Sequence, residues 1–314
     1  MASKKSRRRK AELEKQRKKT LLERKEVRIG IVLVAVIAIV AIAALLMYSG
    51  NDGDNTEENA NTIPEAFEDY SVVNKNSENN QIDVLANDVD NDDDALSLTK
   101  TTTPSHGSVV IDGNYVIYTP SADFSGVDDF EYTTDDGNGG TNTAVIHIIV
   151  ADENPISLID TSMGMIVVEL FEDKTPITAG NFIKLVNDGF YNGMNFYRIS
   201  DDFMIQAGRY FPDGSQDQSP YENIEFETHE DVKHVDGAIS MASTAPGVGG
   251  SGEFFICDGA QSFLDNSYAA FGVVIEGIEV VRDIAAQPHD NSNSAGGGVP
   301  LEDIIINSIT IENQ

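Results

Sequence analysis

The chain has 314 residues, of which 21 are Lys or Arg and 52 are Asp or Glu, so its formal net charge is -31 at pH 7. This length allows two domains of ordinary size, and a hydrophobic content of 40% is enough for packed cores. Residues 1–28 contain 13 of the 21 basic residues and only 4 of the 52 acidic ones. The remaining chain is strongly acidic, which argues against nucleic-acid binding because it would repel phosphates.

Residues 29–48 form an uncharged apolar run between the basic and acidic parts. A helix of this length spans about 30 Å, the thickness of a bilayer core. A cleaved secretory signal is the alternative, but its apolar part is shorter and is followed by a small-residue cleavage site. We therefore expect an uncleaved single-pass transmembrane helix with the basic arm, residues 1–28, in the cytoplasm. The rest of the chain would then be an acidic ectodomain, anchored to the cell membrane and facing away from the cytoplasm.

Residues 49–62 are mostly polar and are predicted to form a flexible linker. From residue 63 to residue 151, short runs typical of β-strands recur, separated by turn pairs such as Asp-Gly and Asn-Gly. Alternation such as that of Val116 and Tyr118 favours strands with one buried face. These features predict a small antiparallel β-sandwich over residues 63–151.

The same stretch resembles the cadherin-like, bacterial immunoglobulin-type repeat of surface proteins. The matching motifs are VLAND at 84–88, PSHG at 104–107, YTP at 118–120, FSGVDDF at 124–130 and DG at 136–137. The resemblance implies a module that acts as a spacer or an adhesive unit.

An acidic run at residues 88–94 offers carboxylate oxygens, which calcium favours. An EF-hand loop beginning there needs Gly at its sixth place and Glu at its twelfth, where this chain has Asp93 and Thr99, so that interpretation fails. Two interpretations stay open, a solvated acidic turn and a looser calcium site. The ligands of the looser site would be Asp88, Asp90 and Asp92.

Beyond the sandwich, residues 156–171 alternate as a β-hairpin that turns at residues 162–164. Thr175 is then predicted to be the N-cap of a helix with Pro176 as its first residue. Apolar residues follow at helical spacing, and Gly189 is predicted to end the helix.

Strand-like runs follow, then a second expected helix around residues 278–286 and a last strand over residues 300–311. The only cysteine, Cys257, lies in an apolar, strand-like run, so no intramolecular disulfide can form. We expect this side chain to be a buried packing residue and not a reactive thiol.

Residues 196–272 contain the candidate site. Arg198 comes shortly before the apolar pair Phe203 and Met204, and Gln206 follows two residues later. One guanidinium beside an apolar pocket supplies neither a nucleophile nor a pair of catalytic carboxylates. It suits a reaction that needs shape and one hydrogen-bond donor, such as rotation about a peptide bond to proline. Three later residues fit the same pocket: Phe255, Phe263 and Leu264.

Two other patterns are weaker indications of function. His229 and His234 suggest a metal pair, but no third ligand lies near them in sequence, so we expect no metal there. The glycine-rich residues 247–252 lack the lysine of a phosphate-binding loop, and we interpret them as a flexible loop beside the pocket.

Residues 155–314 resemble the cyclophilins, a family of peptidyl-prolyl cis-trans isomerases, or rotamases. The matching runs, in order, are DKTPITAGNFIKLVNDGFYNG, FYRI, FMIQAG, ISMA, EFFI, FLD and FGVVIEGIEVV. The resemblance implies a mainly β fold, an eight-stranded antiparallel barrel capped by two helices. It also implies isomerisation of X-Pro bonds in proline-containing polypeptides without a cofactor.

The resemblance assigns the catalytic role to Arg198 and places Ala242 and Ser243 in a loop that binds the peptide backbone. Glu253 stands where the family usually has glutamine. An ionised glutamate only accepts hydrogen bonds, so Glu253 could pair with Arg198 and restrain it. The substrate-binding residues implied are Phe203, Met204, Gln206, Ala242, Ser243, Glu253, Phe255, Phe263, Leu264 and Tyr268.

We therefore expect a membrane-anchored isomerase that helps extracytoplasmic proteins to fold, with the immunoglobulin-type module as a spacer. The alternative is a cyclophilin-like module that binds proline-containing segments with little or no turnover, on a surface adhesin. The departure at Glu253 favours this alternative. A pure adhesin, in which the sandwich alone accounts for binding, is a third interpretation.

Overall fold

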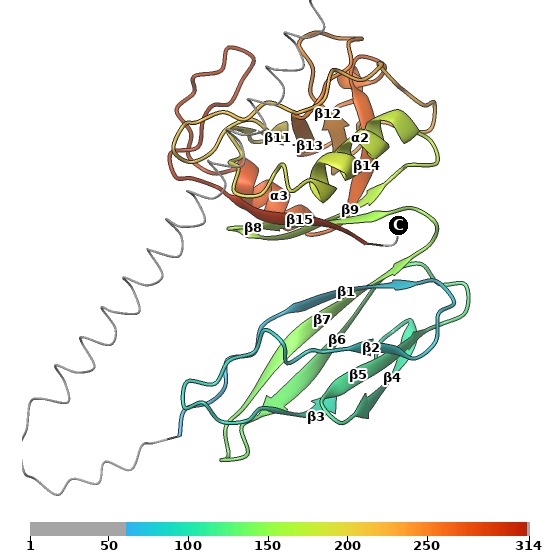
Figure 1. The fold of residues 1–314 in the computed structure, drawn as a ribbon, viewed down its shortest axis with the longest axis vertical. Helices are drawn as coiled ribbons and strands as arrows, with labels where there is room; N and C mark the ends of the chain where they lie inside the picture. Colours follow the sequence, from blue (N-terminus) through green and yellow to red (C-terminus); the bar gives the residue numbers. More distant parts are fainter. Residues whose placement is uncertain (1–60, 313–314) are drawn as a thin grey trace, which may run out of the picture. The chain divides into compact units, whose positions relative to one another are not determined.

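The computed structural model describes residues 61–312 of the chain. The predicted transmembrane helix at residues 29–48 and the basic arm at residues 1–28 lie outside the described residues. Within residues 61–312, no helix has both the length and the apolar character needed to cross a membrane. Two folded regions, residues 61–151 and residues 156–312, follow one another along the described chain (Figure 1).

The first region consists of two β-sheets, with strand orders β1-β7-β6-β3 and β2-β5-β4. The two sheets agree with the predicted sandwich, with one difference, because β1 runs parallel to β7. No hairpin joins these two strands, and the long path between them allows a parallel pairing. The strands are β1 (Asp69–Asn74), β2 (Asn80–Ile82), β3 (Ser97–Thr101), β4 (Gly107–Asp112), β5 (Tyr115–Pro120), β6 (Gly126–Asp135) and β7 (Thr141–Ala151).

The PSHG motif of the sandwich is explained by one buried carboxylate. Asp128 accepts hydrogen bonds from the backbone amides of Ser105 (2.8 Å) and His106 (3.0 Å) and from the hydroxyl of Tyr118 (2.8 Å). A Cβ at Gly107 would lie 2.4 Å from the Tyr118 ring, so only glycine fits there. The motif therefore fixes a turn against the core.

The second region is an eight-stranded antiparallel sheet of order β10-β11-β13-β12-β14-β9-β8-β15. Backbone hydrogen bonds between residues 193–196 and residues 304–306 join its two ends, so the sheet curls into a barrel. The strands are β8 (Ile156–Thr161), β9 (Gly164–Leu170), β10 (Arg198–Ser200), β11 (Met204–Ala207), β12 (Ala238–Met241), β13 (Phe254–Cys257), β14 (Ala269–Glu276) and β15 (Ile306–Glu312).

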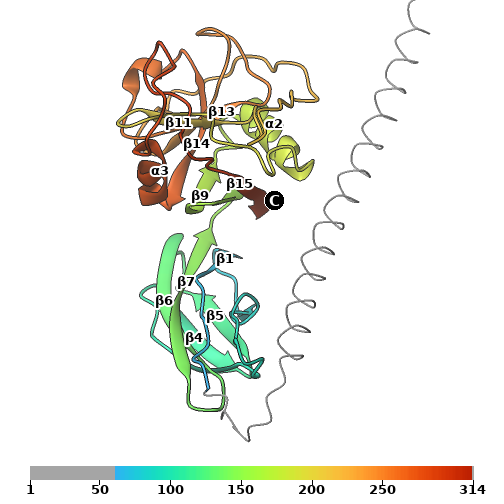
Figure 2. The same ribbon diagram turned by 90° about the vertical axis from the view of Figure 1, so that its left-hand side faces the viewer.

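Two α-helices complete this region, α2 (Pro176–Asn187) and α3 (Ile278–Ala285), with a short 3-10 turn η1 (Ser262–Leu264). The helices lie on opposite sides of the barrel, as Figure 2 shows. The region is thus mainly β with two helices, as the resemblance implies. The hairpin of β8 and β9 and the position of α3 agree with the predictions from the sequence.

Helix α2 begins at Pro176 with Thr175 as its N-cap, as predicted, but the Thr175 side chain makes no capping hydrogen bond. The carboxylate of Glu227 accepts from the backbone amides of Ile177 (3.4 Å) and Thr178 (2.9 Å) instead. A carboxylate at a helix N-terminus accepts hydrogen bonds from the free amides and interacts favourably with the helix dipole. A residue some fifty positions away thus supplies the cap.

The barrel core is aromatic. Phe182 of α2 lies with its ring centroid 5.3 Å from those of Tyr191 and Phe271 and 5.4 Å from that of Phe254. All four side chains are fully buried. Burial of such a side chain contributes about 1.5–3 kcal/mol, so this cluster anchors α2 and the strands behind the site.

The last strand is shorter than predicted, since β15 begins at Ile306 and not at residue 300. Pro300 lacks an amide hydrogen for a strand ladder. The amide of Leu301 bonds to the carbonyl of Pro288 (2.9 Å), beside an isolated antiparallel bridge between His289 and Pro300. Residues 304–306 then make the bonds that close the barrel.

Candidate active site

A cavity of about 630 Å³ opens on the barrel surface, and ten of the eleven predicted site residues line it. Three further lining residues, Ser200, Gln261 and Ala295, carry no signal in the sequence that would have identified them. The ten predicted residues are Arg198, Phe203, Met204, Gln206, Ala242, Ser243, Phe255, Phe263, Leu264 and Tyr268. Glu253 is the one that lies elsewhere, in the neighbouring cavity described below.

The register of three strands brings the central side chains together. Arg198 on β10 pairs with Gln206 on β11, and Gln206 pairs with Phe255 on β13. Paired residues of an antiparallel sheet point to the same face, so the three side chains lie in one row. The spacing of Arg198 and Gln206 in the sequence is thus the spacing of a hairpin.

The apolar part of the cavity is a small cluster of its own. Met204, Phe255 and Leu264 are buried in it, and Phe203 packs against them. Phe263 is 68% exposed, and its ring stacks on Phe203 with 5.8 Å between centroids. The cavity therefore has a buried apolar floor and an aromatic rim that meets solvent.

Arg198 stands at the polar edge of the cavity. Its Nη1 donates to Oε1 of Gln206 (3.5 Å), and its Nε and Nη2 donate to the carbonyl oxygen of Gly296 (3.4 and 3.2 Å). The guanidinium also lies 5.6 Å from the ring centroid of Phe203. Burial lowers the pKa of Arg198, but a guanidinium remains charged at neutral pH. The site is thus a fixed cation beside an apolar surface.

The loop at residues 289–298 supplies the carbonyl that holds Arg198. Gly297 has φ 76°, and a Cβ there would lie 2.0 Å from the carbonyl oxygen of Ile199. Oδ1 of Asp290 accepts from the amides of Ser292 (3.0 Å) and Val299 (2.8 Å), which ties the two ends of the loop together. Sequence reasoning missed this support because it acts through a backbone oxygen.

Glu253 does not pair with Arg198, so that expectation was wrong. Its Oε1 lies 3.2 Å from Nη1 of Arg209, and its Oε2 accepts from the hydroxyl of Tyr197 and from Nε2 of Gln206 (3.1 Å). The register of β11 and β13 brings the residues after β11 beside those before β13. Arg209 is therefore the nearer partner.

A second cavity, of about 330 Å³, adjoins the first and contains Glu253. Four residues line both cavities: Arg198, Gln206, Ala242 and Ser243. The glycine-rich residues 247–252 lie beside this second cavity, as predicted for a loop near the pocket. A Cβ at Gly249 would lie 1.8 Å from the carbonyl oxygen of Ile224, so glycine allows this close packing.

His234 belongs to a buried hydrogen-bond chain and is not paired with His229. Its Nδ1 lies 3.0 Å from Oδ1 of Asp265, and its Nε2 lies 3.0 Å from Oγ of Ser240. This order resembles a hydrolytic triad, but Ser240 is 0% exposed and cannot reach a substrate. The His234 ring stacks on Phe255 with 6.0 Å between centroids, so the chain supports the apolar floor.

Cys257 is fully buried beneath the cavity, and burial raises its pKa to about 12. The thiol is therefore protonated and unreactive at neutral pH. This agrees with the prediction of a packing residue.

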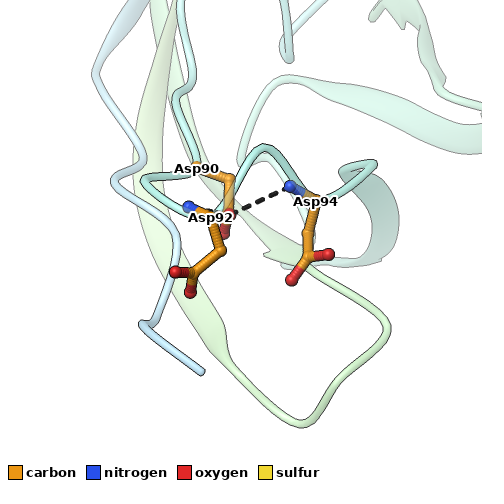
Figure 3. A group of neighbouring side chains, drawn as sticks. All are labelled: Asp90, Asp92 and Asp94. Carbon is orange, nitrogen blue, oxygen red and sulfur yellow. Dashed lines mark hydrogen bonds between the residues drawn. The ribbon is translucent and has the colours of Figure 1, made fainter. Parts of the chain in front are cut away.

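The acidic loop of the sandwich groups Asp90, Asp92 and Asp94, whose ligand atoms lie within 4.8 Å of one another (Figure 3). Asp90 Oδ1 accepts from the amides of Asp92 (2.8 Å) and Asp94 (3.1 Å). Asp88 was predicted as a ligand, but its Oδ1 accepts from the amide of Phe67 and the hydroxyl of Tyr132 (both 2.9 Å). Asp94 thus takes its place in the group, and calcium binding stays a prediction.

The comparisons with known proteins agree with this architecture. Residues 156–311 match the family described as "Cyclophilin type peptidyl-prolyl cis-trans isomerase/CLD", and residues 59–149 match the family described as "Bacterial Ig domain". The chain is 38% identical over 153 residues to "Peptidyl-prolyl cis-trans isomerase-like 3" of Gallus gallus, covering 48% of this chain and 92% of that protein.

It is also 34% identical over 159 residues to "Peptidyl-prolyl cis-trans isomerase B" of Escherichia coli (strain K12), covering 48% of this chain and 96% of that protein. A solved cyclophilin-type isomerase of Cryptosporidium parvum aligns with 28% identity and a TM-score of 0.46, covering 51% of this chain and 98% of that one.

The chain belongs to the cyclophilin-type peptidyl-prolyl cis-trans isomerase family. It is an isomerase of this type whose enzymatic domain follows a bacterial immunoglobulin-like domain.

Proposed function

We propose that the isomerase domain holds a substrate proline in the apolar cavity while Arg198 stabilises the twisted X-Pro amide. The observation that carries this proposal is the position of one fixed guanidinium at the edge of a cavity with a buried apolar floor. This cavity can hold a prolyl ring against its apolar floor while one cationic group donates a hydrogen bond from its edge.

The chemistry follows from amide resonance. A peptide bond resists rotation by about 18–20 kcal/mol because the nitrogen shares its lone pair with the carbonyl. At the twisted geometry the prolyl nitrogen is pyramidal and can accept a hydrogen bond. A donor that binds this state more strongly than either planar isomer lowers the barrier. The reaction forms and breaks no covalent bond.

Arg198 has N–H groups that remain able to donate a hydrogen bond to the substrate amide. Its described hydrogen bonds to Gln206 and Gly296 use three of the five N–H groups of a guanidinium. These two supports fix the plane of the group from behind. The remaining two N–H groups are available to a peptide, and the charge-assisted hydrogen bond they would form is of the strong kind.

A protease-coupled assay of the full-length chain on a short neutral X-Pro peptide tests the proposal. We expect Arg198→Ala to reduce kcat/KM about a hundredfold to a thousandfold, as for loss of a transition-state donor. Arg198→Lys keeps the charge and should restore part of the rate. Arg282→Ala removes an arginine on α3 that pairs with Asp236 (2.6 Å) and should leave the rate unchanged.

The binding-module alternative makes a different forecast in the same experiment. It requires that the wild-type chain binds the peptide, by a fluorescence or calorimetric titration, without accelerating isomerisation. Wild-type turnover equal to the uncatalysed rate, and unaffected by Arg198→Ala, would contradict the proposed mechanism.

We further propose that this isomerase acts on extracytoplasmic proteins while tethered to the cell membrane. The support is the uncharged run at residues 29–48 after a basic arm, and the immunoglobulin-like domain before the enzyme. Protease added to intact expressing cells should remove the isomerase domain and spare a tag placed at residue 1. Protection of the isomerase domain in intact cells would contradict the proposed orientation.

A further inference from the structure

We propose that the second cavity binds an acidic side chain of the substrate polypeptide and that Arg209 selects it. This inference rests on the proposed function, because the substrate's proline must occupy the first cavity. It names a substrate class for the enzyme, namely X-Pro segments that carry Asp or Glu close to the proline.

The two cavities adjoin one another. Arg198, Gln206, Ala242 and Ser243 line both of them, so the cavities share one edge. A peptide with its proline in the first cavity therefore places a nearby side chain in the second. A volume of about 330 Å³ is large enough to hold such a side chain.

The charges of the second cavity favour an anion. Its lining includes two guanidinium groups, those of Arg198 and Arg209, and one carboxylate, that of Glu253. Burial and the nearby Glu253 raise the pKa of Tyr197, so the phenol remains neutral. The amides of Asn223 and Asn293 add neutral N–H donors. The cavity is thus a positive site with donors on several sides.

This polarity is opposite to that of the surrounding domain. Residues 155–312 contain six Lys and Arg residues and 25 Asp and Glu residues, yet two of those six cations line this cavity. Arg209 pairs with Glu253 (3.2 Å), so the lining of this cavity has one cation more than it has carboxylates. This net positive charge favours a negative group in the cavity.

The contacts of Glu253 leave Arg209 able to bind a second carboxylate. Glu253 divides its charge among Tyr197, Gln206 and Arg209, and it meets Arg209 through a single Nη1 contact at 3.2 Å. The side chain of Arg209 is 42% exposed. Its other N–H groups can form a forked contact with a substrate carboxylate, which a planar guanidinium favours.

The experiment compares isomeric peptides of equal net charge with the full-length chain. Each peptide contains one X-Pro bond and one glutamate, placed either within three residues before the proline, within three residues after it, or at a distant end. Equal net charge cancels the long-range repulsion between an acidic peptide and an acidic protein. We expect one near placement to give kcat/KM about threefold to fivefold above the distant placement, as for a partly exposed ion pair.

Two single variants should shift this ratio in opposite directions, which a general structural defect cannot do. Arg209→Gln should reduce the ratio to about one, and Arg209→Lys should retain part of it. Glu253→Gln should increase it, because the cavity then has two cations and no carboxylate. Arg282→Gln, at an arginine whose side chain is 52% exposed and pairs with Asp236, is the matched control and should leave the ratio unchanged.

The outcomes separate this inference from the proposed function. If the wild-type chain isomerises a neutral peptide but gives the same kcat/KM for all three glutamate placements, the inference is wrong and the proposed function stands. A preference that survives Arg209→Gln also overturns the role of Arg209. If no peptide is isomerised faster than the uncatalysed rate, the proposed function itself fails.

Discussion

Gln206 lies between Arg198 and Glu253, with its amide oxygen 3.5 Å from Nη1 of Arg198 and its amide nitrogen 3.1 Å from Oε2 of Glu253. The carboxylate can only accept, so it orients the amide with its oxygen toward the Arg198 guanidinium. Glu253 therefore acts on Arg198 through Gln206 and not by direct pairing. Its own charge is taken up by Arg209 at 3.2 Å.

This relationship predicts that Glu253→Gln has little effect on a neutral peptide. A glutamine at 253 keeps an oxygen that can accept from Gln206, so Arg198 should remain supported. We expect kcat/KM to change by less than about threefold in the protease-coupled assay. A gain of tenfold or more would mean that Glu253 restrains Arg198 in the wild-type chain, as the sequence first indicated.

Gly297→Ala should reduce activity indirectly, by changing the position of Arg198. The added methyl would meet the carbonyl oxygen of Ile199, and the loop must then move Gly296 away from Arg198. We expect kcat to fall about tenfold or more, as for a misplaced catalytic group, with a stability loss of about 1–3 kcal/mol.

Gly214→Ala is the control for Gly297→Ala. Gly214 also has a positive φ (75°), but open space surrounds its Cβ position. This variant shares the backbone strain without the clash, so its melting temperature should fall while kcat is retained. Equal losses of kcat in the two variants would show that the Gly296 carbonyl does not position Arg198.

Asp69 of the sandwich should make stability depend on pH. Burial raises the pKa of Asp69 to about 7, against a hydrogen bond from Tyr132, and the charge of Asp88 adds to the rise. The folded state then holds the proton more tightly than the unfolded chain, whose Asp has a pKa of about 3.9. The free energy of unfolding therefore falls as pH rises from about 4 to about 7. Above that window the whole contribution of Asp69 has been lost.

Asp69→Asn removes this penalty. We expect it to stabilise the chain at pH 8 by about 1 kcal/mol, a figure discounted because Asp69 is partly exposed. Calorimetry of the full-length chain should show a rise of roughly 4–8 °C in the transition of a domain of this size. Asp112→Asn, at an exposed position on β4, is the control and should not change the pH profile. A melting temperature for Asp69→Asn that follows the wild type across pH 4 to 8 would contradict the prediction.

Calcium binding at the acidic loop is the remaining prediction from the sequence. If Asp90, Asp92 and Asp94 hold the ion, millimolar calcium should raise the melting temperature of the wild-type chain. Asp94→Asn removes one ligand and should abolish the rise, while magnesium at the same concentration should have a smaller effect. An unchanged melting temperature with calcium would leave the loop as an acidic turn stabilised by its own hydrogen bonds.

The sequence by itself determined the parts of the site that lie close together along the chain. Arg198, Phe203, Met204 and Gln206 belong to one hairpin, so their spacing already encodes their neighbourhood. The same holds for Thr175 and Pro176 at the start of α2, since helix-start signals are local.

Only the tertiary structure decided which distant residues contact the site and hold its side chains in place. Gly296 is 98 positions from the arginine it supports, and Glu253 is 44 positions from Arg209. Such pairs depend on barrel closure and on strand register, which no local pattern records. The sequence therefore identified Arg198 and the apolar residues that line the same cavity, whereas the fold determined which acid, which carbonyl and which second arginine surround them.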